Sequence, residues 1–351
     1  MIPYGRQDIT QDDIDAVLRV LKSDFLTQGP VVPDFENKIA NHVGADHSIA
    51  FNSATSALHA ACLALNLGPG DWLWTSPISF VASANCGLYC GAKIDFVDIN
   101  PETFNICPIE LEKKLNKAKK QNNLPKVLVL VHMCGHPSDL EEISALAKKY
   151  NIRLVEDASH AIGAKYNSQS IGNCFYSDIT IFSFHPVKII TTGEGGMALT
   201  NTTELAEKMK LFRTHGITRD IDKMSQNDGP WYYQQIDLGF NYRMTDIQAA
   251  LGISQCERLD SYVLKRNEIA NFYNQALSSL PVKTPAIQKY SYSSYHLYII
   301  RLDLDAICSS HHDVFVNLRD LGIGVNLHYI PIHLHPYYQN LGFKKGDFPN
   351  A

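Results

Sequence analysis

The sequence predicts an α/β protein whose parallel sheet is covered by helices on both faces. Over residues 1–245, short β-rich runs alternate with stretches of helical periodicity. The run Lys126–His132 is almost wholly apolar, as a strand covered on both sides should be. A chain of 351 residues exceeds what one core usually serves. We therefore expect a large domain over residues 1–245 and a smaller α+β domain over residues 246–351.

Capping and turn residues place the limits of the expected elements. A helix at Gln11–Ser23 begins after Thr10, a good capping residue, and its apolar residues form one stripe. Gly68-Pro69-Gly70 ends a helix at Thr55–Leu67, because glycine and proline both interrupt helices. Further helices are expected at Phe35–Val43, Leu140–Tyr150, Thr202–Thr214 and from Asp246 to Arg258, and further strands at Ser48–Asn52, Trp72–Ser76, Lys93–Val97, Arg153–Glu156 and Asp178–Ser183. The stretch Thr218–Tyr233 has the composition of a long loop.

Composition and charge argue against several classes of function. Hydrophobic residues make up 45% and charged residues 19%, which is typical of a globular protein. The net charge is −5, so no basic field is present to hold a nucleic acid. Apolar runs such as Val127–Val131 are far shorter than the ~20 residues that cross a bilayer. The N-terminus lacks the plan of a signal peptide, so we expect a cytoplasmic protein with no membrane partner.

The eight cysteines are expected to be buried small hydrophobes rather than disulfide partners. Only Cys86 and Cys90 are closely spaced, and no second pair stands nearby to complete a tetrahedral zinc site. No metal is therefore expected.

Three features fall at the carboxyl ends of expected strands, where open α/β sheets place their ligands. The first is Asn52-Ser-Ala-Thr-Ser56, a run of small residues between a strand and a helix. The free amide groups at such a helix start suit a phosphate, and the helix dipole adds to this preference. Taken alone, such a run of residues is more often an ordinary helix cap than a phosphate site.

The second feature is Asp157, in the run Leu154-Val-Glu-Asp157-Ala-Ser-His160. An acidic residue just past an apolar strand can cap a helix or face solvent. The functional alternative is a carboxylate held against a heterocyclic nitrogen that must stay protonated. A pyridinium ring needs such a partner to act as an electron sink.

The third feature is Lys188, placed between an apolar strand and the glycines of Thr191–Gly196. Burial lowers the pKa of an amine, and a neutral amine is nucleophilic enough for Schiff-base chemistry. Ser183 precedes Lys188 on the same segment and is a candidate phosphate contact. The alternative is a lysine whose stem covers apolar surface while its ammonium group reaches water.

Together the three features describe a site for pyridoxal 5'-phosphate: a phosphate cup, an acid for a ring nitrogen and a lysine for an aldehyde. Phe80, in the run Thr75-Ser-Pro-Ile-Ser-Phe80, is a candidate to stack on the ring. Packing in the core is the alternative explanation of Phe80.

The sequence resembles the DegT/DnrJ/EryC1/StrS family of sugar aminotransferases over Ile2 to Ala351. The motifs that carry the resemblance are Ser183–Gly196, Phe51–Leu58 and Leu26–Pro30. Within the family they are similar to the branch that makes UDP-4-amino-4,6-dideoxy-N-acetyl-β-L-altrosamine in pseudaminic acid biosynthesis. The resemblance implies fold type I of the pyridoxal-phosphate transferases, the aspartate aminotransferase fold, with a large, mostly parallel seven-stranded sheet. It also implies a further helix of the small domain beyond Ala351.

The resemblance implies a role for each matched residue. Lys188 would form the Schiff base, Asp157 would pair with the ring nitrogen, and His160 would lie near the phenolic oxygen, so that these three are the catalytic residues. The implied phosphate contacts are Ala54, Thr55, Ser183 and, across a homodimer interface, Asn241, while Phe80 matches the stacking position. The implied contacts of the nucleotide sugar are Tyr4, Asp24, Phe25, Leu26, Thr27, His328, Tyr329, Ile330 and Pro331, together with Ala54, Ser183 and Asn241.

The implied reaction moves an amino group from glutamate to C4 of a UDP-linked 4-keto-6-deoxy-N-acetyl-hexose. The best match is UDP-2-acetamido-2,6-dideoxy-β-L-arabino-hex-4-ulose. A D-configured 4-keto sugar, of the bacillosamine or perosamine type, stays open as an alternative substrate. Family dehydratases carry histidine at the Schiff-base position, and Lys188 argues against that reaction. A non-catalytic binder of nucleotide sugars is the rival from another class, and it would need no lysine with a matched acid.

Overall fold

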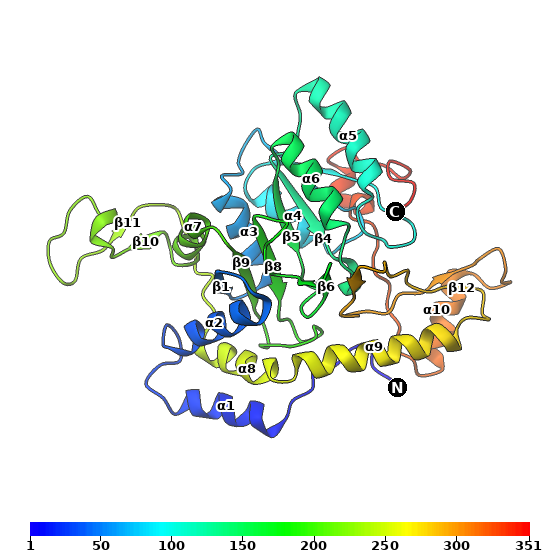
Figure 1. The fold of residues 1–351 in the computed structure, drawn as a ribbon, viewed down its shortest axis with the longest axis horizontal. Coiled ribbons are helices and arrows are strands. Elements are labelled where there is room, and N and C mark those ends of the chain that lie inside the picture. Colours follow the sequence, from blue (N-terminus) through cyan, green and yellow to red (C-terminus); the bar gives the residue numbers. More distant parts are fainter.

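The computed structural model describes residues 1–351, and a seven-stranded sheet forms its centre (Figure 1). The strand order is β1-β9-β8-β5-β4-β2-β3, and every strand except β9 runs in the same direction. The strands are β1 (His47–Phe51), β2 (Trp72–Thr75), β3 (Lys93–Phe96), β4 (Val127–Val131), β5 (Arg153–Asp157), β8 (Ile179–Ser183) and β9 (Gly196–Thr200). The expected α/β fold with a mostly parallel seven-stranded sheet is confirmed.

Alternate residues of the strands enter two separate cores on opposite faces of the sheet. In β4, Leu128 and Leu130 belong to one core, while Val127 and Val129 belong to the other. The first core is covered by α2 (Val31–Val43), α5 (Pro108–Gln121) and α6 (Leu140–Tyr150), and the second by α3 (Ala54–Ala64), α4 (Ala82–Tyr89) and α7 (Thr203–Arg213). Each fully buried Leu or Val side chain contributes roughly 1.5–3 kcal/mol, so the two cores together hold the layers in register.

Three parts of the sheet domain differ from the expectations. The strand β9 was not expected, because the glycines that precede it favour a loop. The expected start of α2 at Phe35 is wrong by one turn: the helix begins at Val31, since Pro33 lies where a missing amide proton costs little. The helices α4 and α5 were not expected either; α4 is short and built mostly of small residues.

The C-terminal part of the chain attaches to the sheet domain at several places. The helix α8 (Asp246–Cys256) packs against α2 and α1 (Gln11–Leu21), and it leads into the long helix α9 (Leu259–Ala276). The strand β13 (Ser291–Tyr292) pairs with β6 (Lys165–Tyr166), which itself pairs with β7 (Gln169–Ser170). The other C-terminal elements are β12 (Val282–Lys283), β14 (Arg301–Leu302), α10 (His311–Asp320) and α11 (Pro336–Gln339).

The expected loop over Thr218–Tyr233 is the tip of a hairpin. Its stems are β10 (Ile217–Thr218) and β11 (Gln234–Gln235), and Figure 1 shows it extending away from the sheet at the left. None of the helices combines the length and the apolar character that a membrane span needs.

Candidate active site

A cavity of about 800 Å³ lies at the carboxyl ends of β1, β5 and β8. Side chains from the first residues of the chain and from the C-terminal part close its other side. Of the residues expected at the site, ten line this cavity: Tyr4, Ala54, Thr55, Phe80, Asp157, His160, Ser183, Lys188, His328 and Tyr329. The fold therefore gathers residues that are spread over more than 300 positions of the sequence.

The amino end of α3 opens into the cavity. The Ser53 hydroxyl caps the helix by accepting a hydrogen bond from the Ser56 amide at 3.1 Å. The amides of Ala54 and Thr55 belong to the first turn, so they have no acceptor within the helix. The N-cap explanation and the phosphate-cup explanation are thus compatible, because Ser53 caps the helix and the two preceding donors stay available.

Gly196 allows the start of α3 and Ser183 to lie side by side. It pairs with Phe51 of β1 and with Ser183 of β8. A Cβ atom at Gly196 would lie 2.4 Å from the Ala54 backbone nitrogen, so only glycine fits. This contact brings the hydroxyl of Ser183 to the same side of the sheet as the start of α3.

Asp157 ends β5 and is 6% exposed. Its Oδ2 accepts a hydrogen bond from the Ser83 hydroxyl at 2.6 Å, and its Oδ1 accepts from the Ser159 hydroxyl at 2.6 Å and from the Ser159 amide at 3.2 Å. The carboxylate therefore stabilises the turn that follows β5, and it also borders the cavity. The hydrogen bond from Ser83, a residue of α4, also fixes the orientation of the Asp157 carboxylate.

Lys188 lies in a turn five residues beyond the end of β8, between the strand and the glycines of Thr191–Gly196, as the expected elements placed it. The turn is closed by the Lys188 amide, which donates to the His185 carbonyl at 2.8 Å. Burial lowers the pKa of the Lys188 amine to about 8, and the Asp157 carboxylate and Cys134 oppose that shift. The Nζ atom makes no hydrogen bond and no ion pair within 4.0 Å. An unpaired amine with a lowered pKa that faces a cavity is the arrangement that a nucleophilic lysine requires.

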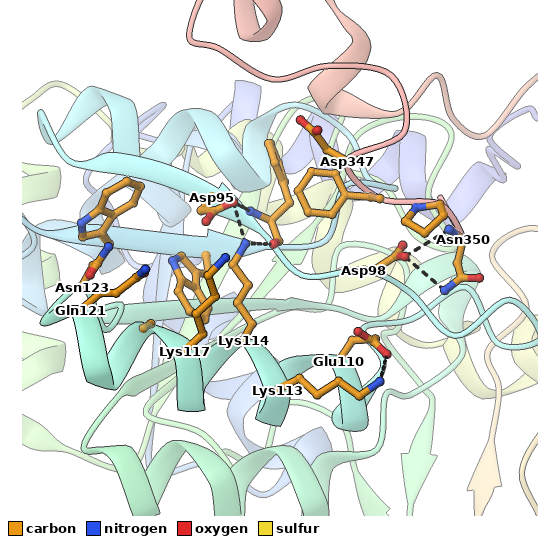
Figure 2. A pocket seen from close by; sticks show the side chains of 16 residues that line it. Asp95, Asp98, Glu110, Lys113, Lys114, Lys117, Gln121, Asn123, Asp347 and Asn350 are labelled. Carbon is orange, nitrogen blue, oxygen red and sulfur yellow. Dashed lines mark hydrogen bonds and ion pairs between the residues drawn. The ribbon is translucent and has the colours of Figure 1, made fainter.

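Lys114 provides the comparison, because burial lowers its pKa as well. It lines a second hollow of about 490 Å³ between α5, β3 and the end of the chain (Figure 2). Its amine pairs with Asp95 at 2.7 Å, donates to the Phe96 carbonyl and lies 4.9 Å from the centre of the Trp74 ring. All of these partners hold the ammonium form in place, so Lys114 is a structural lysine and not a nucleophile.

His160 presents a hydrogen-bond donor to the cavity. Its Nδ1 accepts the backbone amide of Cys134 at 3.2 Å, so Nδ1 carries no proton. Burial lowers the pKa of His160 well below its usual value, and the charge of Lys188 acts in the same direction. The neutral ring therefore carries its proton on Nε2, which lies 3.4 Å from the Tyr329 hydroxyl.

Tyr4 and His328 form a neutral pair at the opposite wall. Their rings stack with centroids 5.2 Å apart, and the Tyr4 hydroxyl lies 2.6 Å from His328 Nε2. Burial lowers the pKa of His328 to about 4, with the charge of Lys188 as a second cause. Burial also raises the pKa of Tyr4 to about 12, and it raises the pKa of Tyr329 by more than that of Tyr4. This wall offers polar but uncharged groups to a ligand.

Seven expected residues do not line the cavity in the single chain. The turn that contains Asp24, Phe25, Leu26 and Thr27 is exposed, and it is anchored by the Thr27–Thr245 bridge. Ile330 and Pro331 follow the cavity-lining Tyr329 but point elsewhere. Asn241 pairs with Thr214 through its backbone, while its side chain is exposed.

Sequence reasoning missed several residues of the cavity wall. The most informative are Ser83, which orients Asp157, and His296, which lies against His160. Neither stands in a motif beside a strand end, so no local pattern could have found them.

Comparisons with known proteins agree with this geometry. The model of the DegT/DnrJ/EryC1/StrS aminotransferase family matches residues 7–351. The chain belongs to this family. A UDP-4-amino-4,6-dideoxy-N-acetyl-β-L-altrosamine transaminase of Campylobacter jejuni subsp. jejuni (serotype O:2) is 42% identical over 342 residues, which are 97% of this chain and 87% of that protein.

Solved structures of the DegT/DnrJ/EryC1/StrS type superimpose over nearly the whole chain. Helicobacter pylori PseC, described as an aminotransferase involved in the biosynthesis of pseudoaminic acid, has a TM-score of 0.86 and 34% identity over 97% of this chain and 88% of that chain. Spr1654 from Streptococcus pneumoniae, in its PLP form, has a TM-score of 0.89 and 29% identity over 99% of this chain and 90% of that chain.

The chain is thus a sugar aminotransferase that depends on pyridoxal 5'-phosphate. The residues of the cavity fit this cofactor. The unpaired amine of Lys188 suits its aldehyde, the free amides of Ala54 and Thr55 suit its phosphate, and the buried carboxylate of Asp157 suits its ring nitrogen. The three groups border one cavity of sufficient size.

Proposed function

We propose that this aminotransferase moves an amino group from glutamate to C4 of a UDP-linked 4-keto-6-deoxy-N-acetyl-hexose. The preferred substrate is UDP-2-acetamido-2,6-dideoxy-β-L-arabino-hex-4-ulose, on the route to pseudaminic acid. The observation that carries the proposed chemistry is the unpaired Lys188 amine, with its lowered pKa, in the same cavity as Asp157. The choice of sugar is supported by the names of the Campylobacter relative and of the Helicobacter structure.

The proposed roles of the residues follow from their positions. When bound, pyridoxal phosphate supplies a reactive aldehyde and a ring that delocalises the electron pair left on the donor's Cα. Lys188 Nζ would take the proton from that Cα and deliver it to the former aldehyde carbon of the cofactor, since its lowered pKa leaves a usable neutral fraction near neutral pH. Asp157 keeps the ring nitrogen protonated, and Ser83 and Ser159 hold its carboxylate toward the cavity.

Binding and orientation fall to the remaining residues of the proposed site. The amides of Ala54 and Thr55 and the Ser183 hydroxyl hold the phosphate, where charge-assisted hydrogen bonds are strong. His160 donates from Nε2 to an oxygen of the ring. Phe80 borders the cavity and is 60% exposed in the single chain, so a ring or a neighbouring subunit has room to cover it.

The proposed assembly is a homodimer with shared active sites. The exposed side chain of Asn241 supports it, because that side chain is free to reach a phosphate in a neighbouring subunit. The exposed turn Asp24–Thr27 and the loop around Ile330 and Pro331 are proposed to contact the nucleotide sugar together with Tyr4, His328 and Tyr329. The cytoplasmic location and the two-domain division at residue 245 stay predictions.

The test is incubation of the enzyme with glutamate and a panel of UDP-linked 4-keto sugars of D and L configuration. We expect a 4-amino product with the L-arabino substrate, identified by mass and by NMR stereochemistry. Preferential amination of a D-configured sugar would replace the preferred substrate by the bacillosamine- or perosamine-type alternative. Absence of any amino product, with the cofactor bound, would contradict the proposed substrate class.

A further inference from the structure

His296 is a buried histidine of the cavity wall whose side chain makes no hydrogen bond. It is 5% exposed, and it comes from the C-terminal part of the chain. Its Nδ1 is buried without any partner. A buried polar atom without a partner costs stability, about 1–3 kcal/mol on average, so its retention calls for an explanation.

The backbone around His296 is held from several sides. On α9, Arg266 donates from Nη1 to the carbonyls of Tyr295 and His296, both at 3.0 Å. Asn267 donates to the Ser293 carbonyl at 3.0 Å, and the Ser293 hydroxyl donates to the Gly135 carbonyl at 2.9 Å. We call Ser293–Leu297 the strap. These bonds hold the strap against α9 and against the Gly135 carbonyl.

The strap is tied to His160 and to the peptide that binds the His160 ring. The Ser294 hydroxyl donates to the His160 carbonyl at 3.0 Å. The Leu297 amide donates to the Cys134 carbonyl at 3.3 Å, and the Cys134 amide is the group that donates to His160 Nδ1. The two imidazole rings then lie 4.4 Å apart between centroids, inclined by 40°.

Gly135 makes this close approach possible. It has φ +92, and a Cβ atom there would lie 2.7 Å from the His160 carbonyl oxygen and 3.0 Å from the His296 amide nitrogen. Any side chain at position 135 would separate the strap from the segment that carries His160. The glycine therefore serves the contact between the two histidines.

We propose that His296 is a positioning residue that acts through His160. The His296 ring covers one side of the His160 ring. It thereby keeps His160 Nδ1 in its hydrogen bond with the Cys134 amide, so that the proton on His160 Nε2 faces the cavity. The contact needs two neutral rings, and burial lowers the pKa of both histidines well below the usual value. The inference rests on the proposed function in one respect only, namely that His160 donates its Nε2 proton to an oxygen of the cofactor ring.

The test reads the tautomer of His160 directly. Holoenzyme labelled with ¹⁵N-histidine gives separate nitrogen signals for protonated and unprotonated ring nitrogens, and the His160 signals are those lost in His160→Gln. We expect one tautomer in the unaltered enzyme, with Nε2 protonated. His296→Ala should give mixed or averaged His160 signals and lower kcat by about tenfold, as expected for one weakened hydrogen bond.

Two further variants separate positioning from general stability. His296→Phe keeps a ring on His160 and should restore both the single tautomer and most of kcat. Ser294→Ala removes only the bond to the His160 carbonyl, and we expect the same spectral change in smaller measure. The matched control is His333→Ala: this buried histidine also has an unpartnered Nδ1 but lies against Phe348, 4.9 Å away, so its loss should leave the His160 signals unchanged.

The proposal is overturned if His296→Ala and Ser294→Ala both leave the His160 nitrogen signals unaltered. It is equally overturned if His296→Phe fails to restore the signals although the protein is folded. Because the nitrogen signals do not depend on turnover, neither result can be confused with failure of the proposed sugar substrate.

Discussion

At the residue scale, the environment of a lysine decides its chemistry. Lys188 and Lys114 are both buried enough for their pKa values to fall. Only Lys114 has a carboxylate partner at hydrogen-bond distance, namely Asp95. The Asp95 carboxylate stabilises the charged form of Lys114, whereas no carboxylate pairs with Lys188. The sequence around each lysine shows an apolar neighbourhood but not this difference.

Replacing Lys188 by alanine should abolish transamination, because no other amine borders the cavity. Borohydride reduction of the holoenzyme followed by peptide mapping should find the pyridoxyl group on Lys188. Lys114→Met is the matched control, and it should lower thermal stability while activity is retained. Recovery of the label on any other lysine would show the assignment to be wrong.

The pH dependence of the apoprotein follows from the sign of the Lys188 shift. Its pKa of about 8 lies below the unfolded value, so between roughly pH 8 and 10.5 the unfolded state binds more protons. The free-energy cost of burying the charged Lys188 amine is therefore fully present below pH 8, and it is relieved as the pH rises toward 10.5. Lys188→Met should stabilise the apoprotein at pH 7, by an order of 1–3 kcal/mol, and much less at pH 10. Urea unfolding at the two pH values measures this, and an equal effect at both would refute the shift.

Asp157→Asn tests whether the carboxylate does more than stabilise its turn. The side-chain amide oxygen of the variant can still accept a hydrogen bond from Ser159, so the turn should remain. A neutral amide does not stabilise a positively charged ring nitrogen, however. We expect cofactor binding to persist and kcat to fall about a thousandfold or more, several kcal/mol in the barrier. Ser159→Ala is the companion variant, because it removes a hydroxyl that holds the turn and the carboxylate but leaves the charge of Asp157 in place. Near-normal turnover in Asp157→Asn would mean that the carboxylate has only the structural role.

At the scale of elements, the site depends on how β9 and α3 approach each other. The expected helix start at Thr55 and the observed start at Ala54 differ by one residue, which capping rules allow. The antiparallel strand β9 was not expected, yet it carries Gly196, which lies against the backbone at the start of α3. Pairing between β9 and β1 is a long-range contact, so it is not encoded in any local pattern.

Gly196→Ala should disturb the phosphate cup, because the added methyl group would meet the backbone of Ser53 and Ala54. We expect weaker binding of pyridoxal phosphate, by about tenfold, and a loss of 1–3 kcal/mol of stability from overpacking. Gly68→Ala is a matched control, since no atom lies within 4 Å of its Cβ position. Cofactor titration by absorbance measures the first effect, and unchanged affinity would argue against a cup at α3.

At the scale of the whole molecule, the single chain leaves several site residues away from the cavity. Asn241 and the turn Asp24–Thr27 are exposed, and so is a large part of Phe80. A two-fold dimer would place the same surface of each subunit against the other and create two equivalent sites. This arrangement accounts for expected contacts that one chain does not make.

Subunit mixing tests the shared site. Lys188→Ala subunits lack the nucleophile, and Asn241→Ala subunits should bind the cofactor phosphate of their neighbour weakly. A heterodimer of the two contains one site with an intact Lys188 and an intact Asn241, so mixing should restore activity. If heterodimers form and no activity returns, Asn241 does not reach the neighbouring site.

The sequence by itself determined the α/β class, the apolar strands, the order of helix start, acid and lysine along the chain, and the membership of the aminotransferase family. These properties reside in local periodicity and in short motifs such as Ser183–Gly196. Only the tertiary structure decided that Lys188 has no carboxylate partner, that Ser83 orients Asp157, and that His296 lies on His160. Each of these depends on contacts between segments far apart in the chain. Burial and long-range hydrogen bonds, which set the protonation of the site, arise only when the layers assemble.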